Sequence, residues 1–126
     1  MEKLDKIFSE YIRLRDADDN GYIRCYCCGS AVFWKHAQNG HYINRRHIGV
    51  RFADANCHSC CVNCNVFSCG NLEAYKKHLL YDYGETIFPI LEMQKRLITK
   101  LSADEIKEMT KHYKREVKRL KKEKGV

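Results

Sequence analysis

The chain has 126 residues, of which 44% are hydrophobic and 31% are charged, and this length suits a single domain. Its 23 Lys and Arg against 16 Asp and Glu give a net charge of +7, which excludes an acidic, solvating protein and favours a polyanionic partner. No apolar run approaches the roughly 18 residues that a membrane-spanning helix needs. The first residues are charged throughout and lack the apolar segment of a signal peptide, so we expect a cytoplasmic protein without membrane association.

The chain divides into three parts with different patterns. Apolar residues at helical spacing predict a helix over residues 3–16, within an N-terminal part that runs to residue 20. Residues 21–70 contain all eight cysteines and show no long apolar periodicity. A segment of this kind cannot bury much apolar surface, so it needs a bound metal ion or another cross-link in order to fold. Short strand-like pieces are expected there, around Ile23 and over residues 31–34, 41–43 and 50–52.

Residues 71–126 are expected to form three helices. Asn71 is a candidate N-cap of the first helix, which Gly84 would close, and Thr86 can cap the second. Ser102 and Glu105 have the spacing of a capping box, which predicts the start of a third helix with a strongly basic end. The predicted class is therefore α+β, a small zinc-stabilised core flanked by one N-terminal and three C-terminal helices.

Two pairs of cysteines, each separated by two residues, predict a structural zinc site. Cys25 and Cys28 form the first pair, and Cys61 and Cys64 form the second. Two residues between thiolates let one tight turn present both sulfurs to a single ion, and four such ligands close a tetrahedral Zn²⁺ site. Zinc is expected rather than disulfides, because structural disulfides are rare in the cytosol. A closed site of this kind leaves no open position for catalysis.

The assignment of the zinc ligands has an alternative. Cys57 and Cys60 have the same spacing as the second pair, and Cys27 could replace a neighbour in the first. The pair Cys61 and Cys64 is favoured, because it leaves room for a β-hairpin and stands where a helix can begin. The other thiols are then expected to be mainly buried and free, namely Cys27, Cys57, Cys60 and Cys69.

The region around the cysteine pairs carries a second pattern. His41 lies between the pairs, Asn56 precedes the second pair and Asn65 follows it directly. This order resembles the HNH nuclease motif, in which a ββα-metal unit is embedded in a treble-clef zinc finger. The motifs CxxCG, GHY, RF, NxH, CxxCN, GNL and AY, over about residues 22–120, narrow the resemblance to the NinG (Rap) family of phage recombination nucleases. The resemblance implies a Mg²⁺-dependent endonuclease for branched DNA, such as Holliday junctions and D-loops, in the cytoplasm of a bacterial host.

The composition of this region agrees with a nuclease that uses one ion. Between residues 20 and 72 the only carboxylate is Asp54, whereas a two-metal nuclease needs several clustered carboxylates. We therefore expect a single Mg²⁺ or Mn²⁺ ion with neutral ligands. His41 is the expected general base, because imidazole can deprotonate water at neutral pH. Asn56 is its expected orienting or metal-adjacent partner, and Asn65 is the expected ion ligand.

One position departs from the HNH pattern. Many HNH enzymes carry an acidic ligand directly before the first His, where this chain has Gly40. His58, two residues after Asn56, is the candidate that would complete the ion site in its place.

Basic residues predict two DNA-binding regions. The first follows His41: Arg45, Arg46, His47 and Arg51 are expected to contact phosphates. The second lies on the last helix, where the expected DNA-binding residues are Lys114, Arg115, Lys118, Arg119, Lys121 and Lys122.

The resemblance makes branched DNA the expected partner, and a homodimer would suit a two-fold junction. Two rival functions are a zinc-finger DNA-binding protein without catalysis and an HNH endonuclease that reads sequence.

Overall fold

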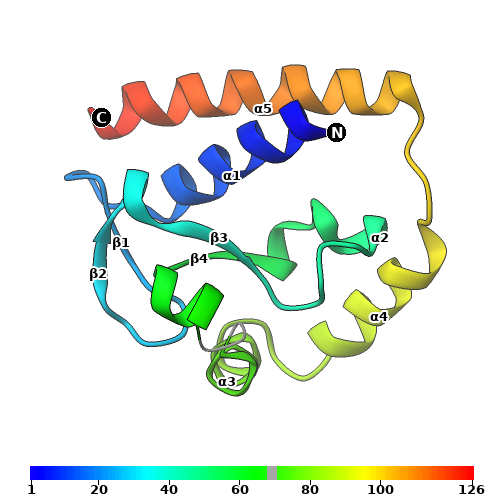
Figure 1. Ribbon diagram of the computed structural model, residues 1–126, viewed down its shortest axis with the longest axis horizontal. Helices are drawn as coiled ribbons and strands as arrows, with labels where there is room; N and C mark the ends of the chain where they lie inside the picture. Colours follow the sequence, from blue (N-terminus) through cyan, green and yellow to red (C-terminus); the bar gives the residue numbers. More distant parts are fainter. Residues whose placement is uncertain (68–70) are drawn as a thin grey trace.

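The computed structural model describes residues 1–67 and 71–126, so that Cys69 lies outside the described residues. Helices α1 and α5 lie against each other on one side of two small sheets, and α3 and α4 lie on the other side (Figure 1). This arrangement confirms the α+β class, with one helix before the strands and three long helices after them. No helix in the described part of the chain is both long and apolar enough to cross a membrane.

Helix α1 (Glu2–Asp16) confirms the predicted N-terminal helix, and its apolar stripe is fully packed. Leu4 and Ile12 are 0% exposed, because α5 (Ala103–Lys124) covers one flank of α1 and the sheets cover the other. The capping box at the start of α5 is also confirmed: the Glu105 amide donates to Ser102 Oγ at 3.1 Å, and the Ser102 amide donates to Glu105 Oε1 at 3.1 Å. These two helices form the wall against which the strands pack.

Two antiparallel pairs of strands form the middle of the molecule. Strands β1 (Tyr22–Arg24) and β2 (Ala31–Phe33) make one pair, followed by the single turn η1 (Trp34–His36). Strands β3 (Gln38–His41) and β4 (Cys57–Cys60) make the other, with Gly40 opposite His58 and His41 opposite Cys57. Strand β4 was not predicted, because all four of its residues are buried and its sequence therefore lacks the alternation of a half-buried strand.

The connection between β3 and β4 differs from the expectation. Residues 50–52 were predicted as strand, but the short helix α2 (Ile48–Arg51) occupies most of them, followed by the turn η2 (Asp54–Asn56). The Asn56 side chain, six residues further along, donates to the carbonyl oxygen of Val50 at 3.0 Å, and this bond favours a turn over an extended strand. Such a contact has no signature in local apolar spacing.

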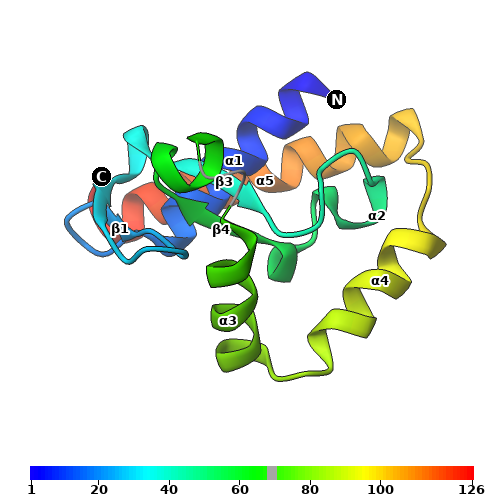
Figure 2. The ribbon, with the colours of Figure 1, turned by 60° about the horizontal axis from the view of Figure 1, so that its bottom comes forward.

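Helices α3 (Leu72–Tyr83) and α4 (Ile87–Leu97) extend from the sheets away from α1 and α5 (Figure 2). Tyr75, Leu79 and Leu91 are at most 1% exposed and close the second part of the core. Gly84 ends α3 with φ +81°, as expected of a helix stop. The other caps differ from prediction, since neither Asn71 nor Thr86 makes a side-chain capping bond. A five-residue π-helix, η3 (Asn63–Phe67), precedes α3.

Candidate functional site

The two predicted cysteine pairs meet in space. The Sγ atoms of Cys25, Cys28, Cys61 and Cys64 all lie within 4.8 Å of one another. The first pair follows β1 and the second follows β4, so the two sheets carry the pairs toward each other. Two thiolates on one tetrahedral zinc ion are about 3.8 Å apart, given Zn–S bonds of about 2.3 Å. The Cys28 and Cys61 sulfurs are 3.7 Å apart, which fits a shared ion.

Hydrogen bonds to sulfur also suit a metal-thiolate cluster. The Cys28 amide donates to Cys25 Sγ at 3.5 Å, and the Cys64 amide donates to Cys61 Sγ at 3.4 Å. Asn71, which was predicted to cap α3, instead donates its Nδ2–H to Cys64 Sγ at 3.5 Å. Because thiolates accept hydrogen bonds better than thiols do, these donors stabilise the form that binds metal. The cluster can therefore hold a structural zinc ion.

The alternative pair, Cys57 and Cys60, lies inside strand β4 and is not part of this cluster. Both residues are almost fully buried, and burial raises the pKa of the Cys57 thiol. Cys60 has a further consequence for the strand beside it. A Cβ atom at Gly40 would lie 2.6 Å from Cys60 Sγ, so only glycine fits at this position. The acidic residue that many HNH enzymes carry directly before the first His has no room here.

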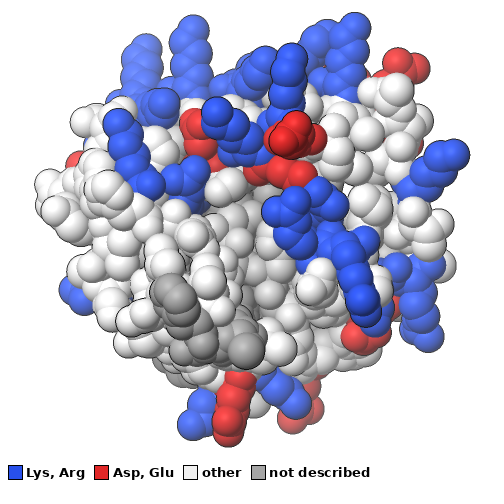
Figure 3. Space-filling model, viewed as in Figure 1, with Lys and Arg blue, Asp and Glu red and all other residues white. Residues whose placement is uncertain are grey.

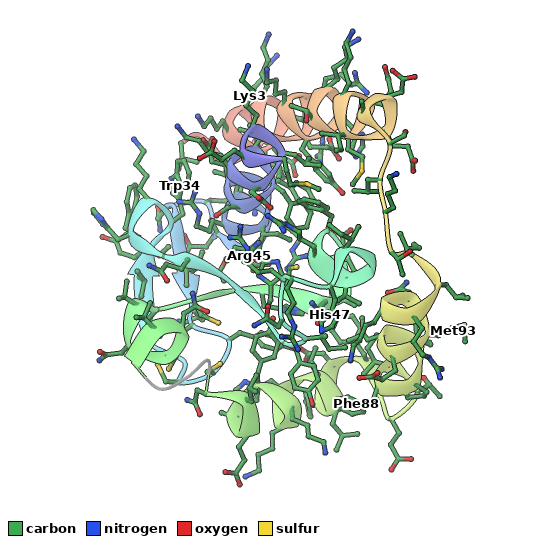
Figure 4. The ribbon with its side chains drawn as sticks, turned by 45° about the vertical axis from the view of Figure 1, so that its right-hand side comes forward. Lys3, Trp34, Arg45, His47, Phe88 and Met93 are labelled. Carbon is green, nitrogen blue, oxygen red and sulfur yellow. The ribbon has the colours of Figure 1, made fainter. Side chains whose placement is uncertain are left out.

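A cavity of about 330 Å³ opens between α1, β3 and η3. His41 and Asn65 line it together, although 24 positions separate them in the sequence. Figure 4 shows Arg45, another of its lining residues, beside α1 and above the loop that carries His47. A neighbouring hollow shares His41, Asn65 and Arg45 with it. The structure therefore brings the expected base and the expected ion ligand to one place.

The ring of His41 is held in one orientation. Its Nε2 atom is 2.9 Å from the carbonyl oxygen of Arg51. A carbonyl oxygen can only accept a hydrogen bond, so Nε2 carries the proton and Nδ1 keeps its lone pair. Burial lowers the pKa of His41, and the positive charges of Arg45 and Arg51 lower it further. The imidazole is therefore neutral at pH 7 and can accept a proton at Nδ1.

The side-chain amide of Asn65 is also held. Its Nδ2–H donates to Gln38 Oε1 at 2.8 Å, which turns Asn65 Oδ1 toward the space above Gly40. Gln38 was not among the predicted site residues, and only its place two residues before Gly40 on a strand would have indicated it. Asn39 also lines the cavity, although its Oδ1 atom is buried and has no hydrogen-bond partner in the part of the chain that the structure describes. Asn65 Oδ1 is therefore the neutral oxygen of the predicted site that is placed to meet a cation.

Asn56 and His58 lie outside this cavity. Asn56 is fully buried, and its side chain accepts from the Ile43 amide at 2.8 Å and donates to the Ile43 and Val50 carbonyl oxygens at 3.0 Å. It organises the loop after β3 and does not reach the ring of His41. His58 is 6% exposed, with Tyr75 and Tyr83 hydroxyls each 3.0 Å from one of its ring nitrogens. The structure does not bring His58 to Asn65, so the cavity forms without it.

The basic residues after His41 differ in their surroundings. Arg51 is largely buried and forms an ion pair with Asp5 of α1, and Arg45, which is 58% exposed, contacts the same carboxylate. Arg46 is exposed, and its Nε–H donates to the ring of His47 at 3.2 Å. Asp5 is not among the predicted site residues, because it belongs to α1 and only the packing of that helix brings it to the cavity. Arg45 and Arg46 are the residues of this group that project to solvent.

The expected DNA-binding residues of α5 also divide into two groups. Arg119 is paired with Glu116 at 2.8 Å and Glu123 at 2.7 Å, and Lys121 is half-buried with its ammonium group 5.7 Å from the Trp34 ring. In the space-filling view, Lys and Arg side chains gather along the edge formed by α5 (Figure 3). Within residues 1–67 and 71–126, the basic residues of this group that are exposed and make no ion pair are Lys114, Arg115, Lys118 and Lys122.

Fold and site together define a small α+β protein whose core carries a four-cysteine cluster able to hold zinc, next to a polar cavity and a basic helix. Residues 1–123 match the family model described as "Bacteriophage Lambda NinG protein", and the chain belongs to this NinG family. Membership places the protein among phage proteins and suggests a role related to recombination. No curated protein and no solved structure matches the chain.

Proposed function

We propose that the protein is an endonuclease that cleaves phosphodiester bonds in branched recombination intermediates such as Holliday junctions and D-loops. The observation that carries the proposal is the meeting of His41 and Asn65 in one cavity, with the proton of His41 held on Nε2. The four-cysteine cluster and the hairpin β3–β4, which is followed by the short π-helix η3, support the proposal, because an HNH unit embedded in a treble-clef zinc finger needs a hairpin, a helix and a zinc site. NinG membership supports this reading, since it suggests a recombination-related role.

His41 has the properties of a general base. Its neutral Nδ1 accepts a proton from water, while the Arg51 carbonyl keeps the ring in place. Asn65 Oδ1 would hold the divalent ion, and the bond from Asn65 Nδ2 to Gln38 Oε1 fixes the orientation of this side-chain amide. Mg²⁺ or Mn²⁺ bound there would supply stabilisation of negative charge on the phosphate and the leaving oxygen. Neutral oxygen ligands suit this task, because they leave most of the cation's charge available to the substrate.

Branched DNA is the proposed partner. The net charge of +7 and the exposed basic side chains of α5 favour contact with phosphates rather than with bases, as expected of an enzyme that selects shape. A homodimer is proposed because a four-way junction has two-fold symmetry and requires two cuts. Its interface is not the apolar stripe of α5, because Val117 and Leu120 are buried against α1 and β1 within the same chain.

The decisive experiment compares labelled four-way and linear duplex DNA incubated with zinc-loaded protein and Mg²⁺ or Mn²⁺. We expect nicking of the branched substrate, and His41→Ala should reduce it roughly 10²–10⁴-fold while zinc content, fold and DNA affinity stay unchanged. His36→Ala is the matched control, because His36 is exposed on η1 and does not line the cavity. Asn65→Ala should also be slow, but excess divalent ion should partly restore its rate.

Other results would favour the rival functions. Junction binding without cleavage in any divalent ion would indicate a zinc-finger DNA-binding protein that lacks catalysis. Cleavage of linear duplexes at one sequence would indicate an HNH enzyme that reads bases. Full activity of His41→Ala would remove His41 from the mechanism.

A further inference from the structure

Asp5 joins the first turn of α1 to the end of α2. Its carboxylate accepts a hydrogen bond from Arg51 Nε at 2.8 Å and a second from Arg51 Nη2, so the two groups meet in a bidentate pair. Arg45 Nη2 adds a third donor at 3.3 Å. The Asp5 and Arg51 side chains are only 19% and 16% exposed, and the pair is therefore better shielded from solvent than a surface ion pair. Forty-six positions of sequence separate its members.

The main chain of Arg51 continues this connection to His41. The carbonyl oxygen of Arg51 receives the hydrogen bond from His41 Nε2 at 2.9 Å, and Cys57 Sγ donates to the same oxygen at 3.6 Å. Arg51 is the last residue of α2, which has four residues. A helix of one turn has little stability of its own, because nucleation is unfavourable and few hydrogen bonds follow. The position of this carbonyl oxygen therefore depends on contacts from outside α2.

We propose that Asp5 is a positioning residue for His41: by holding the Arg51 side chain, it places the Arg51 carbonyl oxygen that keeps the imidazole proton on Nε2. The catalytic meaning of this role rests on the proposed endonuclease function, in which His41 Nδ1 is the base. Asp5 contacts Arg51 and Arg45 and has no contact with the His41 ring among the hydrogen bonds of the described residues. Asp5 thus acts on His41 through Arg51: its carboxylate binds the Arg51 side chain, and the Arg51 carbonyl oxygen binds the His41 ring.

Asp5 also offsets part of the positive charge of the two arginines that line the cavity. Its removal has two opposite consequences, which separates the proposal from a purely structural role. Arg45 and Arg51 are released to attract phosphate, so DNA affinity rises. The carbonyl oxygen of Arg51 is no longer held, so the ring of His41 samples both tautomers and both orientations, and the chemical step slows.

The test uses the zinc-loaded chain of residues 1–126 and its Asp5→Asn variant. Nitrogen-15 NMR of labelled histidine, recorded without DNA and without Mg²⁺, reports the tautomer of His41 directly, with His41→Ala used to assign its signals. We expect the native protein to show the Nε2–H form and Asp5→Asn to show a mixture of the two neutral forms. In cleavage assays, kcat of Asp5→Asn should fall roughly 10- to 100-fold, while the dissociation constant for DNA decreases.

Glu2→Gln is the matched control, because Glu2 is the other acidic residue in the first turn of α1 and does not line the cavity. It should leave the tautomer and kcat unchanged. The exchanged pair Asp5→Arg with Arg51→Asp keeps the main-chain carbonyl and the net charge, and it should restore the single tautomer. This double variant also decides the matter if Asp5→Asn does not fold.

Three results would overturn the proposal. The first is an unchanged Nε2–H tautomer in Asp5→Asn. The second is faster cleavage by that variant, which would show that Asp5 only masks the arginines. The third is a mixture of tautomers in the exchanged pair. Because the NMR measurement needs no substrate, it stands even if the protein proves to have no nuclease activity.

Discussion

The Nζ atom of Lys124 lies 2.6 Å from the carbonyl oxygen of Leu14, and the same ammonium group donates to the carbonyl oxygen of Arg15 at 2.9 Å. A side chain from the last turn of α5 thus satisfies carbonyl groups at the end of α1, where the helix provides no donors of its own. Its positive charge also faces the negative end of the α1 dipole. Burial lowers the pKa of Lys124, in keeping with a structural role. Lys124 therefore stabilises the packing of α5 against the end of α1.

Replacing Lys124 with Met should therefore lower the free energy of unfolding by about 1–3 kcal/mol, because the substitution keeps the apolar stem and leaves the carbonyl groups unpaired. Urea denaturation followed by circular dichroism measures this difference. Lys122→Met serves as the control, since Lys122 is exposed on the same turn of α5. Equal stability of the two variants would show that water replaces the lysine without cost.

The exposed lysines of α5 should contribute to DNA affinity. Deleting residues 114–126 is unsuitable as a test, because it would remove the buried Val117 and Leu120 together with the charges. The triple substitution of Lys114, Lys118 and Lys122 by Gln keeps the helix, and we expect it to weaken binding and reduce the salt slope by about one per lost phosphate contact.

Fluorescence anisotropy at several salt concentrations measures both quantities. Arg119→Gln should have a smaller effect than any one of the lysine substitutions, because Glu116 and Glu123 already neutralise Arg119. An unchanged affinity and salt slope in the triple variant would identify this face of α5 as a solvated surface.

One zinc ion per chain is expected at the four-cysteine cluster. Cys61→Ser should lose the metal and unfold the middle of the chain, because binding of zinc also provides folding energy there. Cys57→Ser should retain one zinc ion, since Cys57 lies within β4 outside the cluster. Elemental analysis of the purified variants and circular dichroism with a chelator test this pair, and zinc loss in Cys57→Ser alone would move the site to the alternative pair.

Stability should fall with acid in a range set by His58. Burial lowers the pKa of His58 to about 4, whereas a histidine in the unfolded chain has a pKa near 6.5. The unfolded state therefore binds more protons, and its stability relative to the folded state increases as the pH falls. The contribution of His58 is complete above pH 6.5 and is lost progressively down to about pH 4, with a total of about 3 kcal/mol.

Denaturation of the native protein and of His58→Gln at pH values from 7 to 5 separates this effect from protonation of the cysteines, which both proteins share. The native protein should lose more stability over this range than His58→Gln. Parallel curves would show that His58 titrates normally in the folded protein.

Several elements follow from the sequence alone. Apolar residues at helical spacing predict α1 and the three C-terminal helices, and the capping box between Ser102 and Glu105 marks the start of α5 within one residue. The spacing of the cysteines also predicts a cluster of four thiols. These features are local, since a helix depends on residues three or four positions apart and a metal-binding turn on two cysteines separated by two residues.

The tertiary structure decided the rest, because those features depend on residues far apart in the chain. Strand β4 has no alternating pattern, and its pairing with β3 shows that Cys57 and Cys60 lie inside a sheet while Cys61 and Cys64 project toward the first pair. The side chains of His58 and His41 lie on opposite faces of the β3–β4 pair, so His58 does not reach the cavity that His41 lines. The carboxylate beside that cavity comes from Asp5, 36 positions before His41, and only the packing of α1 on the sheet brings it there.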